Sequence, residues 1–227
     1  MHRNAMTVPA TLRIDFVSDV ACPWCAVGLA SLQQALARLG DEVHADIHLQ
    51  PFELNPQMPR DGEDAGEHIM RKYGIGEAQL DANRKALRER AAMVGVTINT
   101  GNGSRVWNTF DAHRVLHWAE LQDQGKALAL KQALLRAYFT HNENVADHAV
   151  LERIARETGL DGEQARRVLE SGDYADEVRA QEHRFQQAGI HSVPAIIVNN
   201  TWLISGGQPP EVFENALREI AAKTATA

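Results

Sequence analysis

The chain has 227 residues, of which 44% are hydrophobic and 23% charged, and its formal net charge is −7. This composition is typical of a soluble globular protein. No apolar run approaches the ~18–20 residues needed to cross a bilayer, and the negative charge argues against nucleic acid as a partner. Residues 1–10 lack the apolar core of a secretory signal, so we expect a cytoplasmic protein with no membrane partner.

The N-terminal part of the sequence predicts a strand, a helix and a second strand. Residues 11–17 are an apolar run that is typical of a buried strand. Residues 23–39 carry apolar side chains at helical spacing, and Gly40 is a stop signal. Residues 43–50 alternate between apolar and polar side chains. A strand–helix–strand order implies a parallel pair of strands with a right-handed crossover.

The middle of the chain is helical in pattern. Three prolines and an acidic turn interrupt the chain after the second strand, and helical patterns then continue from about residue 64 to residue 188. Aspartates at predicted helix starts and glycines at predicted helix ends support these elements. The predicted helices are 79–94, 108–122, 127–142, 145–158, 161–171 and 174–188.

The C-terminal part returns to strand patterns. Residues 192–198 are typical of a loop that leads into a buried strand. A turn at Asn199-Asn200 and a second strand over residues 202–205 then predict a hairpin, and a final helix follows through about Ala222. We therefore predict an α/β fold with two domains. The first is discontinuous and comprises residues 10–63 and 189–227, and the second is a helical insertion of residues 64–188.

The two cysteines of the chain both lie in the segment Cys22-Pro23-Trp24-Cys25. Cys22 falls where the first strand meets the first helix, and a helix N-terminus favours a thiolate. Cys25 follows one turn later, so the two thiols can form a disulfide and attack another one. A pair of buried reduced cysteines is one alternative. A zinc site is another, but a closed site needs four ligands and the chain has no second cysteine pair.

Five segments carry a resemblance to a known family. The chain resembles the DsbA-like branch of the thioredoxin superfamily, and FrnE-type members of that branch along nearly its whole length. The resemblance implies a thioredoxin-like fold and thiol–disulfide oxidoreductase activity. The five segments are residues 15–25, 51–56, 108–114, 192–195 and 205–210.

The resemblance also assigns roles to individual residues. Cys22 is expected to attack a substrate disulfide, and Cys25 to resolve the resulting adduct. The peptide bond between Val193 and Pro194 is expected to be cis and to face the two cysteines. No cofactor is expected besides a redox-active Cys22–Cys25 disulfide. The expected partners are protein or small-molecule disulfides and thiols, and a cellular thiol reductant or oxidant.

Further residues are candidates for the surroundings of the thiols. Pro23 and Trp24 are expected at the exposed rim of the site. Asp15 and Asp19 are candidates for a carboxylate that moves the proton of the resolving thiol, but strand alternation does not show which way Asp15 points.

Two residues of a later segment are candidates for substrate selection. We expect Asn108 and His113 to line a substrate groove above the cysteines. His113 and His117 also have the spacing of a metal-binding pair on a helix, but no recognised pattern supplies an acidic partner, so no metal site is expected.

Two other functions are compatible with this architecture. Kappa-type glutathione transferases and hydroxychromene-carboxylate isomerases look similar, but they typically have a serine where Cys22 stands. A non-catalytic holdase chaperone is the other alternative, and it needs no thiols. The paired cysteines favour disulfide exchange over both.

Overall fold

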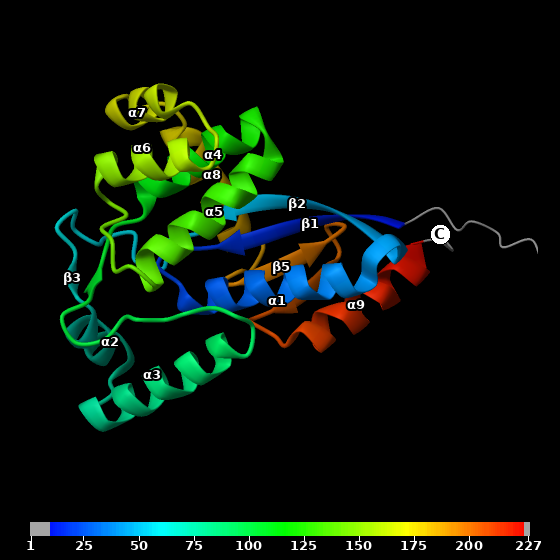
Figure 1. Ribbon diagram of the computed structural model, residues 1–227, viewed down its shortest axis with the longest axis horizontal. Coiled ribbons are helices and arrows are strands. Elements are labelled where there is room, and N and C mark those ends of the chain that lie inside the picture. Colours follow the sequence, from blue (N-terminus) through cyan, green and yellow to red (C-terminus); the bar gives the residue numbers. More distant parts are fainter. Residues whose placement is uncertain (1–9, 225–227) are drawn as a thin grey trace, which may run out of the picture.

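A four-stranded mixed sheet forms the centre of the protein. The structure is a computed structural model that describes residues 10–224. The strands are β1 (Ala10–Ser18), β2 (Val43–Pro51), β5 (Ala195–Val198) and β6 (Trp202–Ser205), in the order β2-β1-β5-β6. β2 runs parallel to β1, whereas β5 is antiparallel to β1 and β6 to β5 (Figure 1). The predicted α/β fold of the thioredoxin type is confirmed.

Two helices, α1 (Pro23–Leu39) and α9 (Pro210–Thr224), pack together beside the sheet (Figure 1). The buried side chains of α9 include Phe213, Leu217 and Ile220, which recur at the spacing of one helix face. They share a core with the buried side chains Leu12, Ile14 and Phe16 of β1. Burial of this apolar surface fixes the position of α1, whose first residues follow directly on the turn after β1.

The remaining helices gather around the end of the sheet at which β1 ends and α1 begins (Figure 1). α4, α5 and α8 contact β2, and α3 contacts α1. The inserted helices therefore surround the N-terminus of α1. Their bounds are α2 (Ala65–Tyr73), α3 (Glu77–Ala92), α4 (Phe110–Gln122), α5 (Gln124–Phe139), α6 (His148–Glu157), α7 (Gly162–Glu170) and α8 (Ala175–Gln187).

The inserted region also contains structure that the sequence did not predict. The inserted region includes α2, whose N-cap residue Asp64 accepts a hydrogen bond from the backbone N–H of Glu67 and whose C-cap residue is Gly74. A small two-stranded sheet joins β3 (Glu63–Asp64) to β4 (Arg105–Val106). These short strands tie the start of the inserted region to the segment that precedes α4.

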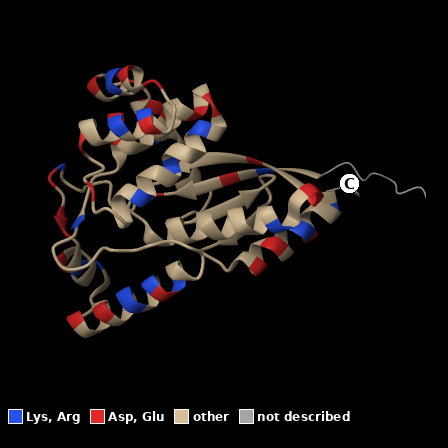
Figure 2. Cartoon of the chain, viewed as in Figure 1, with Lys and Arg blue, Asp and Glu red and all other residues tan. Residues whose placement is uncertain are grey.

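Charged side chains lie mainly on the outer helices, and α1 carries almost none (Figure 2). The single charged residue of α1 is Arg38, in its last turn. No helix within residues 10–224 is long and apolar enough to cross a membrane. The helix that starts at the two cysteines is therefore an apolar element, and about half of its residues are buried.

Candidate active site

The two thiols lie at the N-terminus of α1. Cys22 is the N-cap residue with an extended backbone, and Pro23 occupies the first helical position. The backbone N–H of Cys25 donates to the carbonyl of Cys22 at 3.0 Å. Both cysteines are free thiols, and their side chains share a hydrogen bond. Cys22 retains 3% of its exposure and Cys25 none, so Cys22 is the more accessible of two buried thiols.

The Val193–Pro194 peptide bond is cis and lies beside Cys22. The Cys22 thiol donates to the carbonyl oxygen of Val193 at 3.5 Å. The carbonyl of Pro194 in turn accepts from the backbone N–H of Gly206 at 2.8 Å. The loops before β5 and after β6 therefore meet at the thiol pair.

The rim of the site is formed by the residues between the two cysteines. Trp24 is 41% exposed and Pro23 is half-buried. A Cβ atom on Gly207 would come within 2.9 Å of the Trp24 carbonyl oxygen and 3.3 Å of the indole ring. The backbone at Gly207 is thus close enough to hold Trp24 in place, with part of the indole open to solvent.

Burial dominates the chemistry of Cys25. Burial raises its pKa well above the ordinary value of a thiol, and the hydrogen bond and charge of Cys22 raise it further. Two groups act in the opposite direction, the charge of Lys131 and a hydrogen bond from the backbone of Asp19. Lys131 belongs to α5 and is 1% exposed.

The structure separates the two candidate aspartates. Asp19 lies at the site: its Oδ1 accepts from the N–H of Ala21 at 3.1 Å and its Oδ2 from the N–H of Leu54 at 2.8 Å. Asp15 bonds to other side chains: its Oδ1 accepts from the Arg13 guanidinium at 2.8 Å and from Gln50 Nε2 at 2.6 Å. Of the two, Asp19 is the carboxylate next to the thiols.

His113 lies inside the protein rather than along an open groove. It is 2% exposed, and its Nε2 lies 3.4 Å from Asp19 Oδ1. Although burial favours the neutral acid, the hydrogen bond and charge of His113 and the two backbone amides lower the pKa of Asp19. His113 therefore reaches the thiols through Asp19, and a direct contact with a substrate does not fit its position.

Asn108 lies just before α4 and bonds to its first residue. Its Nδ2 donates to the carbonyl of Met58 at 2.9 Å, and its Oδ1 accepts from the N–H of Phe110 at 2.9 Å. Both ends of the side chain are thus engaged within the protein. The residue connects α4 to the loop that follows β2.

A second buried group of charges interacts with His113. Glu53 and Glu182 are both almost fully buried, and the half-buried Arg179 bonds to both carboxylates. The Arg179 guanidinium also lies 3.8 Å from the centre of the Phe110 ring. Burial raises the pKa of each glutamate, and the negative charge of Glu182 raises that of Glu53 further.

Sequence reasoning missed two lysines near the thiols. Lys72 on α2 donates to the Leu54 carbonyl at 2.9 Å and to Asn55 Oδ1 at 2.7 Å. Burial lowers its pKa, whereas the negative charges of Asp19 and Cys22 raise it. Lys131 left a signal in the sequence, because it falls on the apolar face of α5 beside Leu130 and Leu134. Lys72 left none, because α2 has no buried residue.

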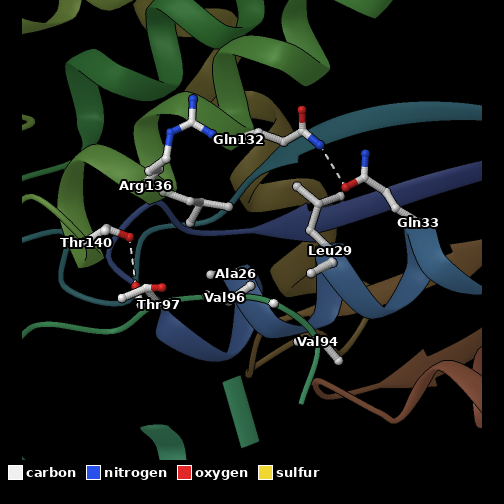
Figure 3. A pocket seen from close by; sticks show the side chains of 12 residues that line it. Ala26, Leu29, Gln33, Val94, Val96, Thr97, Gln132, Arg136 and Thr140 are labelled. Atoms are coloured by element: carbon white, nitrogen blue, oxygen red, sulfur yellow. Dashed lines mark hydrogen bonds between the residues drawn. The ribbon is translucent and has the colours of Figure 1, made fainter. Parts of the chain in front are cut away.

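A cavity of about 360 Å³ opens beside α1 but does not include the thiols (Figure 3). Ala26 and Leu29 of α1 line one wall, Gln132 and Arg136 of α5 another, and residues 94–97 a third. Gln132 Nε2 donates to Gln33 Oε1 at 2.7 Å across the top of this cavity. This hydrogen bond joins α5 directly to the helix that carries the cysteines.

Comparison with known proteins identifies the family. Residues 13–218 match the model of the DSBA-like thioredoxin domain, and the chain belongs to this family. Members of the family are thiol–disulfide oxidoreductases. The family membership indicated by the five sequence segments is therefore confirmed, whereas the FrnE-type assignment within it stays a prediction.

Individual relatives span nearly the whole chain. The uncharacterized protein YwbO of Bacillus subtilis (strain 168) is 30% identical over 210 residues, which cover 92% of this chain and 97% of YwbO. The probable DsbA oxidoreductase SCO1869 from Streptomyces coelicolor is 36% identical, with a TM-score of 0.84 over 92% of this chain and 89% of that one. The fold is also shared with the cytosolic disulfide reductase DsbM from Pseudomonas aeruginosa, which is 17% identical. The TM-score is 0.63, and the match covers 91% of this chain and 98% of DsbM.

Proposed function

We propose that the protein exchanges disulfides with protein or small-molecule substrates through Cys22 and Cys25. The observation that carries this proposal is the pair of hydrogen-bonded thiols at the start of α1, with Cys22 against the carbonyl of Val193. Membership of the DSBA-like family supports the same activity.

The reaction begins at Cys22. Its thiolate attacks one sulfur of a substrate disulfide, the substrate S–S bond breaks, and a mixed disulfide forms between Cys22 and the substrate. Cys25 then loses its proton and attacks Cys22 Sγ. The mixed disulfide breaks, the substrate leaves as a second thiolate, and Cys22 and Cys25 are joined. Two equivalents of a cellular thiol then reduce the Cys22–Cys25 disulfide and are themselves joined in a disulfide, and no other cofactor is required.

An extended substrate would lie along the cis peptide and the exposed rim. Pro194 contributes no N–H, and a strand-like segment of substrate can pair with free backbone groups beside it. Trp24 offers a partly exposed indole for contact with apolar side chains. We assign Pro23, Trp24, Val193 and Pro194 to this surface, and Asn108 and His113 to its support from within.

The expected compartment determines the direction of the reaction. We propose that the protein acts in the cytoplasm, where thiols are kept reduced and net reduction of substrate disulfides is favoured. A cellular thiol reductant is then its redox partner.

One set of assays separates this function from the two alternatives. The wild type should reduce insulin disulfides in the presence of a dithiol, and Cys22→Ser should not. A glutathione-dependent isomerase or transferase would instead bind glutathione in both forms of the protein. A holdase would suppress aggregation of an unfolded protein equally well with and without Cys22. Absence of insulin reduction by the wild type would contradict the proposal.

A further inference from the structure

Lys131 is the single lysine among the buried side chains of residues 10–224. It is 1% exposed and stands on α5 among buried apolar residues such as Leu130 and Leu134. Burying an ammonium group is costly unless a partner compensates it. A fully buried lysine that interacts with a reactive group is therefore a candidate for a functional role.

The groups that face Lys131 come from three elements. α5 contacts α1, and Lys131 interacts electrostatically with Cys25 and Cys22 at the start of α1 and with Asp19 in the turn before it. From α4, His113 and His117 line the same cavity of about 10 Å³ as Lys131. This cavity is too small for anything larger than a water molecule. The cavity beside Lys131 is thus too small to admit a substrate.

Asp19 is poorly suited to take the proton of Cys25. Its carboxylate already accepts from the backbone N–H groups of Ala21 and Leu54, and His113 lies 3.4 Å from its Oδ1. These contacts lower its pKa, and a carboxylate of lowered pKa is a weak base. Burial moves Lys131 the other way, because a lowered pKa makes the neutral amine more available as a base.

We propose that Lys131, supplied by the inserted helix α5, holds the proton that Cys25 releases during resolution and stabilises the Cys25 thiolate by its charge. The inference rests on the proposed function. In the mixed disulfide, the Cys25 S–H proton passes to the Lys131 amine, which becomes an ammonium. The Cys25 thiolate attacks Cys22 Sγ, the bond from Cys22 to the substrate breaks, and the substrate thiolate takes a proton from solvent. Lys131 afterwards loses its extra proton.

The test measures the rate of the Cys25 step, which resolves the mixed disulfide, separately from the rate of the first attack by Cys22. Reduced protein is mixed with the disulfide of thionitrobenzoate, and the coloured thiolate is recorded in a stopped-flow instrument. The first release reports attack by Cys22 and accelerates with reagent concentration. The second release reports attack by Cys25 on the mixed disulfide and is independent of that concentration. Cys25→Ser should retain the first phase and lose the second.

We expect Lys131→Met to slow the second phase by about 100-fold near neutral pH, with the first phase unchanged. Because the thiol must then lose its proton to hydroxide, the second phase should rise tenfold for each unit of pH from about pH 6 to about pH 9. Lys126→Met is the matched control, since it removes an exposed lysine from the same helix and should leave both phases unchanged. Thermal unfolding of Lys131→Met should occur no lower than in the wild type, because a buried charge has been replaced by an apolar side chain.

Several outcomes would overturn the proposal. Lys131→Met with the wild-type second phase and pH profile would show that Lys131 takes no part in resolution. Slowing of both phases together, or an unfolding temperature well below that of the wild type, would indicate a packing role. If Lys131→Met does not fold, Lys131→Gln is measured in its place against the same criteria. Absence of a second phase in the wild type would instead contradict the proposed function itself.

Discussion

Pro194 packs directly against Gly28, one turn beyond Cys25 on α1. A Cβ atom at Gly28 would lie 2.9 Å from Pro194 Cγ and 3.4 Å from the Cα of Gly207. The absence of a side chain at Gly28 therefore lets the cis Val193–Pro194 segment approach the helix that carries the thiols. The same segment supplies the Val193 carbonyl that accepts from the Cys22 thiol.

Gly28→Ala should destabilise the protein and slow disulfide exchange. The added methyl group must displace Pro194, and overpacking of this kind costs about 1–3 kcal/mol. Urea unfolding and insulin reduction measure the two effects. Gly172→Ala is the control, because this exposed glycine lies between α7 and α8 and a methyl group there would meet no neighbouring atom within 4 Å. Equal behaviour of the two variants would show that the approach of Pro194 to Gly28 is not required.

Alkylation should distinguish the two thiols. We expect iodoacetamide to modify Cys22 first, because Cys25 is fully buried and burial raises its pKa. Modification of Cys25 should require higher pH or partial unfolding. Mass spectrometry of peptides after short exposures gives the order, and urea-unfolded protein, in which both cysteines are accessible, is the control. Preferential labelling of Cys25 in the folded protein would reverse the assigned roles.

Much of the central fold could be predicted from local patterns. The apolar runs of β1 and β5 and the helical spacing of α1 place side chains in the core. β6 was also predicted from its apolar run, although its side chains are largely exposed. α2 was missed because it has nine residues with few apolar side chains, and none of them is buried. β3 and β4 were missed because a two-residue strand is defined by its partner.

The candidate site could be predicted only as far as its sequence motifs extend. Cys22, Cys25 and Pro194 stand in short motifs and are adjacent in the structure. The choice between Asp15 and Asp19 could not be made, because β1 is buried on both faces from Ile14 to Ser18 and shows no alternation. His113 was expected to line a groove but is buried, because elements distant in sequence pack over it. Lys131 is likewise brought to Cys25 by tertiary packing alone.

Asn108→Ala should lower stability because two hydrogen bonds are lost together. The side chain bonds to the carbonyl of Met58 and to the N–H of Phe110, and we expect a loss of about 1–2 kcal/mol in the free energy of unfolding. Asn108→Asp keeps the acceptor for Phe110 but loses the donor to Met58, and should fall between Ala and the wild type. Exchange with a protein disulfide should slow more than exchange with a small disulfide, since Asn108 supports the loop after β2. If stability and both rates are unchanged, Asn108 has neither role.

The Glu53–Glu182 pair should make stability fall as pH rises. Burial raises the pKa of both groups, so the folded state binds more protons than the unfolded state above the ordinary glutamate pKa of about 4.3. Stability contributed by these protons is present at low pH and is lost as pH rises through the folded pKa values. Glu182→Gln should reduce this loss between about pH 4.5 and pH 7 by on the order of 1 kcal/mol.

Urea unfolding of the wild type and of Glu182→Gln at about pH 4.5 and about pH 7 measures this loss in the free energy of unfolding. Glu163→Gln, at an exposed position on α7, is the control and should keep the wild-type pH dependence. If the stability of Glu182→Gln depends on pH as that of the wild type does, the assignment of raised pKa values to the pair is contradicted.

Trapping of mixed disulfides tests the division of labour between Cys22 and Cys25 most directly. Cys25→Ser and Cys22→Ser are each incubated with an oxidised protein substrate, quenched with acid and analysed by non-reducing electrophoresis and mass spectrometry. The account predicts that Cys25→Ser accumulates adducts linked through Cys22, because the thiol that resolves them is gone. Cys22→Ser should accumulate few, since its remaining thiol is fully buried. Equal trapping by the two variants, or adducts found mainly on Cys25, would contradict the account.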